Sequence, residues 1–354
     1  MRILVTGAAG FIGSHVAQAL LQRGDTVVGL DNLNDYYDPA RKRANLEAVR
    51  RFVRRPEVAR GRHVANFTFL EGDVRDRALI SRLFGEHHFD VVVHLAAMAG
   101  VRASIDDPHL YYDVNLIGTL TLLDAAVERL PALSTGLRTD DVDVLSASKS
   151  RPVRVSNFVF ASTSSVYGNT RGIPFVETDP CNGPLAPYPA SKKAGELLGY
   201  TYHHLYGLNF TAVRFFTVYG PRGRPDMMAH KVLDNIFLDR PVPVYNDGQM
   251  HRDWTYIDDI VAGVVAAVDR PLGYEIINLG RGEPVLLADF IRLVEKNAGQ
   301  PSSLIPRPMP PADVPYTFAD VSKARRLLGY EPQISVDEGV KRFWQWYESE
   351  ILHS

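Results

Sequence analysis

The segment Gly7-Ala8-Ala9-Gly10-Phe11-Ile12-Gly13 decides the fold, because it joins an apolar run, residues 3–6, to a stretch with helical spacing, residues 11–22. Glycines at this spacing permit a tight turn, close approach of the backbone to a pyrophosphate, and close packing of a helix on a strand. The free amides and the positive dipole end of the helix favour phosphate. We therefore predict a dinucleotide site at this turn.

Acidic residues follow the next two predicted strands. Asp31 ends the second strand, where a carboxylate accepts hydrogen bonds from the adenosine ribose and repels a 2′-phosphate, so NAD is favoured over NADP. Asp73 and Val74 follow the third strand and are placed to meet the adenine edge; alternatively, Asp73 caps the helix that begins near Asp76. The predicted NAD-binding residues are Gly7, Gly10, Phe11, Ile12, Gly13, Asp31, Asn32, Asp73, Val74, Leu95, Ala96, Ala97, Ser162, Tyr188, Lys192 and Phe215.

Strand-like and helix-like segments alternate through the N-terminal half of the chain. Strands are predicted over residues 3–6, 26–30, 67–70, 91–94, 158–162 and 210–215. Helices are predicted over residues 11–22 and 40–53, and from near Arg77, Leu110 and Tyr188. This order predicts an α/β fold, a Rossmann-type doubly wound parallel sheet with helices on both faces.

The pattern changes after about residue 220, where segments shorten and prolines cluster. Helices are predicted near Asp258, Leu287, Ser322 and Val336. We expect residues 1–220 to form the NAD-binding domain, with a surface insertion at about 131–152 of undefined role. Residues 221–354 should form mainly a smaller substrate-binding lobe, with segments that return to the first domain.

Composition excludes several classes of protein. Of 354 residues, 45% are hydrophobic, which suffices for a large core, and a net charge of −2 gives no field to hold nucleic acid or an anionic membrane. The single cysteine, Cys181, excludes an intrachain disulfide and a cysteine-based zinc site, and no metal site is predicted. No signal peptide or membrane span is visible, so a cytoplasmic protein is expected.

Tyr188 and Lys192 lie in the segment Tyr188-Pro189-Ala190-Ser191-Lys192, which opens a predicted helix. A spacing of four places both side chains on one helix face. A lysine ammonium and an oxidised nicotinamide both favour a phenolate, so the pKa of Tyr188 is expected to fall below about 10. Such a tyrosine can take a proton from a sugar hydroxyl while hydride leaves the same carbon. The alternative is an ordinary surface helix.

These motifs together resemble the extended short-chain dehydrogenase/reductase family over nearly the whole chain. In that family a Ser or Thr near the end of the fifth strand hydrogen-bonds the reacting hydroxyl. The matching run is Ser162-Thr163-Ser164-Ser165-Val166-Tyr167-Gly168, so the resemblance gives this catalytic role to Thr163. Members that eliminate water or decarboxylate uronic acids carry carboxylates before Val-Tyr-Gly. Ser164 and Ser165 stand there instead, which favours oxidation followed by reduction on the opposite face, an epimerisation.

The substrate class is indicated by Arg214-Phe215-Phe216-Thr217-Val218-Tyr219-Gly220-Pro221-Arg222-Gly223-Arg224-Pro225-Asp226-Met227, which resembles family members that epimerise uronic acids at carbon 4. The segment 30–38 carries the same resemblance. Members that act on neutral sugars typically have Asn at the position of Thr217. A guanidinium pairs with a carboxylate through two parallel bonds, so Thr217 and Arg224 are expected to hold a sugar carboxylate.

Family positions also imply contacts with the nucleotide. Arg252 matches the residue that binds the UDP diphosphate, and Asp313 matches a neighbour of the uridine or ribose. The family usually has Gly at position 312, where this chain has Ala312, and that departure bears on the local loop geometry. An isolated arginine is equally consistent with a solvated surface charge. The expected substrate-binding residues are Arg102, Thr163, Ser164, Ser165, Thr217, Arg224, Arg252 and Asp313.

The resemblance implies an NAD-dependent enzyme that interconverts UDP-glucuronate and UDP-galacturonate by transient oxidation at carbon 4. Two alternatives share the scaffold, a UDP-glucose/galactose-type 4-epimerase and a UDP-glucuronate decarboxylase. An alternative of another class is a non-catalytic NAD-sensing protein, which would commonly lack the Tyr/Lys pair. The family also implies a homodimer, formed through the predicted helices 110–129 and 188–204.

Overall fold

The computed structural model describes residues 1–54, 66–128 and 153–353, so the predicted insertion at 131–152 lies outside the described residues. The chain forms two compact units. The first comprises Met1–Ser162, Ala186–Val213 and Val264–Ile276, and the second comprises Thr163–Leu185, Arg214–Gly263 and Ile277–Ser354. The chain therefore returns to the first unit after residue 263. The assignment of NAD and substrate binding to residues 1–220 and 221–354 stays a prediction.

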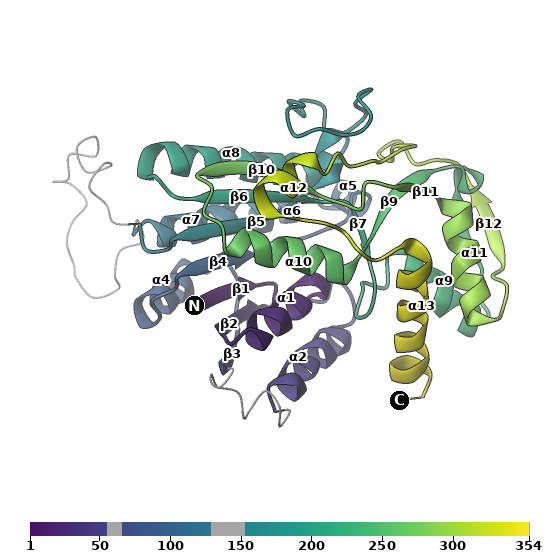
Figure 1. Ribbon diagram of the computed structural model, residues 1–354, viewed down its shortest axis with the longest axis horizontal. Helices are drawn as coiled ribbons and strands as arrows, with labels where there is room; N and C mark the ends of the chain where they lie inside the picture. The colour runs from purple at the N-terminus through teal and green to yellow at the C-terminus, as the bar shows by residue number, and fades with distance from the viewer. Residues whose placement is uncertain (55–65, 129–152, 354) are drawn as a thin grey trace. The chain divides into compact units, whose positions relative to one another are not determined.

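The main sheet belongs chiefly to the first unit (Figure 1). Within the described residues it has seven strands in the order β10-β6-β5-β4-β1-β2-β3. The strands are β1 (Arg2–Thr6), β2 (Thr26–Asp31), β3 (Asn66–Glu71), β4 (Val91–His94), β5 (Asn157–Thr163), β6 (Phe210–Phe215) and β10 (Tyr274–Leu279). Strand β1 pairs in parallel with β2 and β4, β2 with β3, and β4 with β5. All six predicted strands are confirmed.

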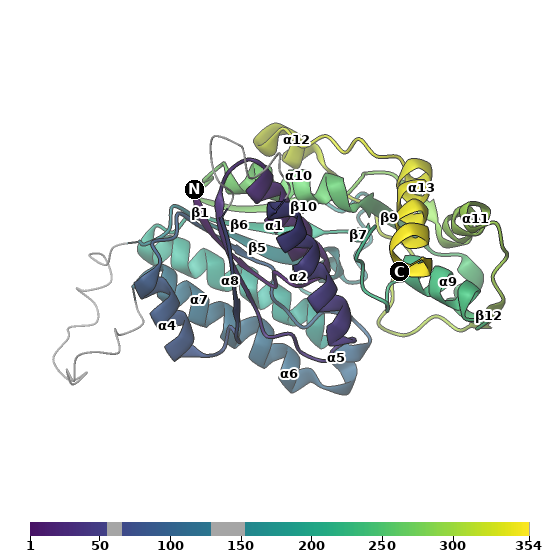
Figure 2. The same ribbon diagram turned by 90° about the horizontal axis from the view of Figure 1, so that it is seen from below.

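Helices cover both faces of this sheet in the two views of Figures 1 and 2, with α1 and α2 on one face and α4, α7 and α8 on the other. The helical segments of the first unit are α1 (Phe11–Gln22), α2 (Pro39–Val53), α4 (Arg77–Glu86), α5 (Ala103–Asp106), α6 (Pro108–Tyr112), η1 (Asp113–Ile117), α7 (Gly118–Ala126) and α8 (Pro187–Tyr206). Buried apolar side chains from the strands and from α4, α7 and α8 form one continuous core. The predicted Rossmann-type fold is confirmed.

The helix predicted from Leu110 to residue 129 is not one regular α-helix. It consists of α6, a π-helical segment η1, and α7, which ends at Ala126. A π-helix inserts one extra residue per turn, and such turns are frequent at functional sites. Apolar periodicity predicts helical structure here but does not reveal this local change of pitch.

The second unit contains two small sheets. Strands β11 (Pro284–Leu286), β9 (His251–Tyr256) and β7 (Thr217–Tyr219) form one, and β12 (Leu304–Arg307) pairs with β8 (Val242–Tyr245) in the other. The helices are η4 (Ser164–Tyr167), α9 (Met228–Phe237), η5 (Asn246–Gly248), α11 (Leu287–Ala298), α12 (Ser322–Leu328), α13 (Val336–Tyr347) and η6 (Glu348–Leu352), while α10 (Ile257–Val268) continues into the first unit. The helices predicted near Asp258, Leu287, Ser322 and Val336 are confirmed.

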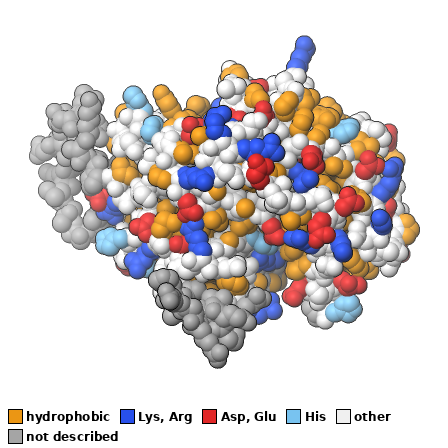
Figure 3. Space-filling model, viewed as in Figure 1, with side chains coloured by type: hydrophobic (Ala, Val, Ile, Leu, Met, Phe, Trp, Pro, Cys, Tyr) orange, Lys and Arg blue, Asp and Glu red, His pale blue; other side chains and the backbone are white. Residues whose placement is uncertain are grey.

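The molecular surface carries both signs of charge. On the face shown in Figure 3, blue and red side chains are interspersed, in agreement with a net charge of −2. In the described parts of the chain, none of the helices has the length and apolar character that a membrane span requires. The same residues contain no group of three or more His, Cys, Asp or Glu side chains arranged to hold a metal ion.

Candidate active site

The turn between β1 and α1 requires glycine for steric reasons. Gly7 has a φ of +71°, and a Cβ there would lie 2.8 Å from the backbone nitrogen of Ala96. A Cβ on Gly13 would lie 2.0 Å from the carbonyl oxygen of Gly7. Gly10 precedes α1 in an extended conformation without a side-chain cap. A compact turn at an uncapped helix start is suited to a pyrophosphate, and pyrophosphate binding here stays a prediction.

Asp31 lies at the end of β2 with 9% of its surface exposed. Its carboxylate accepts hydrogen bonds from the amides of Ala9 (3.1 Å) and Leu33 (2.9 Å). Burial raises the pKa of Asp31, and these amides together with the charge of Lys42 oppose the rise. The carboxylate is therefore fixed beside the glycine turn, where it fits the predicted ribose contact.

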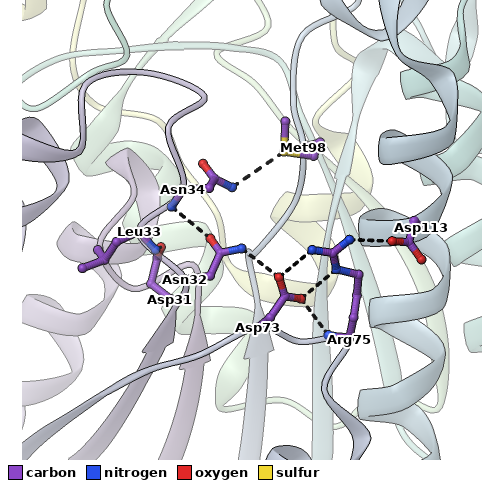
Figure 4. A network of polar contacts seen from close by, with 8 residues as sticks. All are labelled: Asp31, Asn32, Leu33, Asn34, Asp73, Arg75, Met98 and Asp113. Carbon is purple, nitrogen blue, oxygen red and sulfur yellow. Dashed lines mark hydrogen bonds and ion pairs between the residues drawn. The ribbon is translucent and has the colours of Figure 1, made fainter.

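The carboxylate of Asp73 belongs to a polar network at the carboxyl ends of β2 and β3 (Figure 4). It accepts hydrogen bonds from Asn32 Nδ2 (2.9 Å) and from the amide and guanidinium of Arg75 (2.8–2.9 Å). The Arg75 hydrogen bonds lower the pKa of Asp73 to about 2. The alternative role of Asp73 as a helix cap is wrong, because the cap is Asp76, which accepts from the amides of Ala78 and Leu79 (both 3.0 Å).

A buried chain of hydrogen bonds supports the segment after β4, which sequence reasoning missed. Thr119 donates its hydroxyl proton to the carbonyl of Asn115 (2.6 Å), so it accepts from His94 Nε2 (2.9 Å). His94 Nδ1 then accepts from the Thr6 hydroxyl (2.7 Å), and Thr6 Oγ1 accepts from the amide of Ala96 (3.2 Å). Burial, followed by the charge of Lys192, lowers the pKa of His94 well below its usual value. The imidazole is therefore neutral and holds the start of residues 95–97.

Helix α8 carries Tyr188 and Lys192 and begins at Pro187, one residue before the predicted start. The ring of Tyr188 meets that of Tyr111 edge to face at 6.2 Å between centroids. Lys192 is only 2% exposed, and its Nζ lies 4.8 Å from the centroid of the Phe160 ring, so it is not a surface cation. Burial lowers the pKa of Lys192 to about 7. The expected ammonium is thus partly neutral at neutral pH.

Asn115, on η1, is a second residue that sequence reasoning missed. It is fully buried; its Oδ1 accepts from the amide of Met98 (2.8 Å), and its Nδ2 donates to the carbonyl of Met98 and to Ser191 Oγ (both 2.9 Å). Ser191 donates in turn to the carbonyl of Tyr188 (2.8 Å). The sequence signal for Asn115 was a single asparagine within an apolar helical pattern. Through Ser191, Asn115 fixes the first turn of α8, which carries the Tyr/Lys pair.

Thr163 ends β5 and caps the short helix η4. Its Oγ1 accepts from the amide of Ser165 and lies 3.2 Å from Ser165 Oγ, while the residue itself is 7% exposed. Ser162, one residue earlier, donates to the fully buried carboxylate of Glu196 (2.7 Å). The hydroxyls of Ser162 and Thr163 therefore have defined positions, and the contact of Thr163 with the reacting hydroxyl stays a prediction.

Arg224 already pairs with a carboxylate of its own chain. Its Nε and one terminal nitrogen donate to the two oxygens of Asp226 at 2.9 and 2.8 Å, the two-bond geometry expected for a sugar carboxylate. Burial acts to raise the pKa of Asp226, but the hydrogen bonds and charge of Arg224, with smaller contributions from its surroundings, outweigh it and the pKa is lowered. Thr217, also predicted to face the carboxylate, begins β7 and is half-buried. The sequence showed Asp226 two residues from Arg224 but gave no reason to pair them.

The predicted nucleotide residues lie on β9 and on the loop before α12. Arg252 is half-buried on β9 and donates to the carbonyl of His251 (2.8 Å). Its neighbour Asp253 is fully buried and accepts from the amides of residues 281, 282 and 319 at 2.7–3.0 Å, a structural role that sequence reasoning missed. Asp313 is half-buried in a turn, and Ala312 fits there without a positive φ, so the departure from glycine is accommodated. Arg102, in the first unit, is exposed.

Comparison with known proteins identifies the relatives of this chain. Residues 3–280 match the sequence model of the NAD dependent epimerase/dehydratase family. A UDP-glucuronate 4-epimerase of Thermodesulfobacterium geofontis is 41% identical over 349 residues, which cover 98% of this chain and 96% of the relative. The crystal structure of UDP-glucuronic acid 4-epimerase from Bacillus cereus, in complex with UDP-glucuronic acid and NAD, is 34% identical, covers 99% of both chains and has a TM-score of 0.81.

A neutral-sugar relative has an equally similar fold. The structure of UDP-glucose 4-epimerase from Thermotoga maritima with UDP-glucose also has a TM-score of 0.81 and covers 99% of both chains, but is 28% identical. The fold alone therefore does not separate the two substrate classes, whereas sequence identity is higher with the uronic-acid enzymes. The family resemblance inferred from the motifs is confirmed. The chain belongs to the NAD dependent epimerase/dehydratase family.

Proposed function

We propose that this chain is an NAD-dependent isomerase that interconverts UDP-glucuronate and UDP-galacturonate by epimerisation at carbon 4 of the sugar. The observation that carries the chemistry is the buried Lys192 one helical turn beyond Tyr188, fixed by Asn115 and Ser191. The relatives and Ser164-Ser165, where carboxylates would be needed for elimination or decarboxylation, support the reaction and substrate.

The residues predicted to bind NAD fit it. The glycine turn leaves room for a pyrophosphate that any Cβ at Gly7 or Gly13 would remove, and Asp31 offers a fixed carboxylate to the ribose. Asn32, Asp73 and residues 95–97 complete the predicted site. Bound NAD supplies the oxidising equivalent for the first half of the reaction and the reducing equivalent for the second. The cofactor is therefore unchanged overall and should stay bound through turnover.

In the proposed mechanism Tyr188 takes the proton of the carbon 4 hydroxyl and later returns it. Lys192 stabilises the phenolate when protonated, and Thr163 hydrogen-bonds the reacting hydroxyl. The 4-keto sugar turns over within the site before it is reduced on its other face. Because Tyr188 both accepts and returns one proton, the site needs no second acid, in keeping with Ser164 and Ser165.

The 4-keto uronic acid is a β-keto acid and can lose carbon dioxide when the bond to its carboxylate aligns with the ketone. We propose that Thr217, Arg224, Ser164 and Ser165 hold the carboxylate out of that alignment. Arg252 is proposed to bind the diphosphate of UDP. The remaining candidates for substrate contact are Arg102 on the first unit and Asp313 on the second.

We also propose a homodimer formed through α6, η1 and α8. These elements expose large apolar side chains, among them Tyr112, Ile117, Leu197 and Tyr200, which are 40–56% exposed. Exposed apolar surface of this kind marks protein interfaces. Light scattering coupled to size-exclusion chromatography should give twice the chain mass, and Leu197→Glu should shift it to the monomer. A monomeric parent protein would contradict this part of the proposal.

The decisive experiment is incubation of the purified protein with UDP-glucuronate without added NAD, followed by identification of the product. UDP-galacturonate formed without carbon dioxide would support the proposal and show that the cofactor co-purifies. A UDP-pentose as main product would identify a decarboxylase instead. Turnover of UDP-glucose but not of UDP-glucuronate would identify a neutral-sugar epimerase. Bound NAD without turnover of either sugar would favour the NAD-sensing protein.

A further inference from the structure

Arg75 bridges two carboxylates from different elements of the first unit. Its Nε and one terminal nitrogen donate to Asp73 at 2.9 and 2.8 Å, and its other terminal nitrogen donates to Asp113 at the start of η1. Figure 4 shows the guanidinium between the two acids. The planar fork of arginine can serve two carboxylates at once in fixed directions, which a lysine ammonium cannot.

Arg75 also sets the direction of the Asp73 carboxylate. Each oxygen of Asp73 accepts two hydrogen bonds, Oδ1 from the amide and Nε of Arg75, and Oδ2 from Arg75 and from Asn32. A carboxylate has about four acceptor positions, and these four hydrogen bonds hold the group in one orientation. Three of the four donors belong to Arg75. The orientation of Asp73 therefore depends mainly on this one residue.

Asp113, the second carboxylate, is connected through η1 to α8, the helix that carries the Tyr/Lys pair. Asp113 is the first residue of η1, and Asn115, two residues later, is hydrogen-bonded to Ser191 on α8. The adjoining turn is packed as tightly, because a Cβ on Gly118 would lie 2.6 Å from Val74 Cγ2. A shift of η1 relative to the turn at residues 73–75 would therefore move Asn115 against α8.

We propose that Arg75 is a positioning residue that ties the adenosine end of the NAD site to the catalytic helix, through Asp73 on one side and through Asp113 and Asn115 on the other. Arg75 is not among the residues predicted to contact NAD or substrate. This inference rests on the proposed function, because the effect on catalysis is read in turnover of UDP-glucuronate.

Two substitutions separate the contact of Arg75 with Asp73 from its contact with Asp113. Asp113→Asn leaves the bonds between Arg75 and Asp73 in place, so we expect unchanged NAD content and KM, and a kcat lowered about threefold, as for loss of one partly exposed ion pair. Arg75→Met removes the contacts with both Asp73 and Asp113. We expect NAD affinity to fall about tenfold, because Asp73 loses its charge-assisted bonds. The matched control is Arg77→Met, since Arg77 is a more exposed arginine 3.9 Å from Asp124.

The double variant Arg75→Met/Asp113→Asn tests whether both residues act through one link. We expect its kcat, measured at saturating NAD, to equal that of Arg75→Met, because residues of one network do not act additively. Multiplied effects, or an Asp113→Asn protein with the parental kcat, would overturn the inference. The same loss of kcat in Arg75→Met, Asp113→Asn and the control Arg77→Met, accompanied in each by a lowered melting temperature, would also overturn it. If the parent protein does not turn over UDP-glucuronate, the proposed function fails, whereas the NAD affinity of Arg75→Met still tests the contact with Asp73.

Discussion

Two cations with proposed roles, one in each unit, lie in contrasting environments. Lys192, in the first unit, is 2% exposed, and burial lowers its pKa to about 7. Arg224, in the second unit, has a side chain 22% exposed and pairs with Asp226 through two bonds. The charge of Lys192 thus varies with pH, which suits proton transfer. The charge of Arg224 is permanent, but its guanidinium already binds the carboxylate of Asp226. A substrate carboxylate would therefore have to replace Asp226.

Removal of the proton acceptor should give the largest effect. We expect Tyr188→Phe to lower kcat about 10³-fold, within the range known for general acid–base catalysis, while NAD content stays at the parental level. Rates would be measured by chromatography of the two UDP-sugars. Tyr206→Phe, on the same helix, is the control. Parental turnover by Tyr188→Phe would show that the mechanism assigned to the Lys192 side of the site is wrong.

The pH dependence of kcat should report the buried lysine. Burial lowers the pKa of Lys192 to about 7, and the Tyr188/Lys192 pair must lose one proton before Tyr188 can accept the proton of the sugar, so we expect kcat to rise with pH through a midpoint near 7. Below that midpoint each pH unit should lower kcat about tenfold. Lys192→Met should move the midpoint upward toward about 10, because Tyr188 loses its ammonium partner. A profile identical in both proteins would remove Lys192 from the proton chemistry.

Arg224→Ala tests the cation that already pairs with a carboxylate of its own chain. We expect KM for UDP-glucuronate to rise about tenfold with little change for UDP-glucose, because only the uronate loses a charge-assisted pair. Both sugars would be compared as substrates, or as competing ligands in calorimetry if UDP-glucose is not turned over. Equal losses for both sugars would move Arg224 from the sugar carboxylate to the nucleotide.

Asp226→Asn should give the smallest change in kinetic constants. It tests whether Arg224, unlike the buried Lys192, exchanges one carboxylate partner for another. If Asp226 competes with the substrate carboxylate for Arg224, its removal should lower KM for UDP-glucuronate about threefold, the scale of an exposed ion pair. The double variant with Arg224→Ala should then show no gain. A raised KM would mean instead that Asp226 orients the guanidinium for the substrate.

What the sequence predicted depends on how local the determinant is. The glycine turn, the six strands and the Tyr188/Lys192 spacing follow from neighbouring residues, and the structure reproduces the turn and all six strands. The contacts it did not reveal join residues far apart in the chain, such as Thr6 with His94 and Asn115 with Ser191.

The shift in the pKa of Lys192 was missed for a related reason. Its cause is burial, which comes from the packing of whole elements and not from the Tyr-x-x-x-Lys motif. The short strands of the second unit, such as β7 and β11, have only three residues each, too few to show a periodic pattern.

The hydrogen-bond chain through His94 has no end at which a proton could enter or leave. Each of its bonds has one direction, and it ends at the amide of Ala96 and the carbonyl of Asn115. Neither peptide group gives up or takes on a proton, so the chain cannot conduct one from the catalytic helix toward the interior of the sheet. In the proposed mechanism, a proton that Tyr188 takes from the sugar therefore has no exit along this path, which suits a reaction that returns the proton to the same hydroxyl.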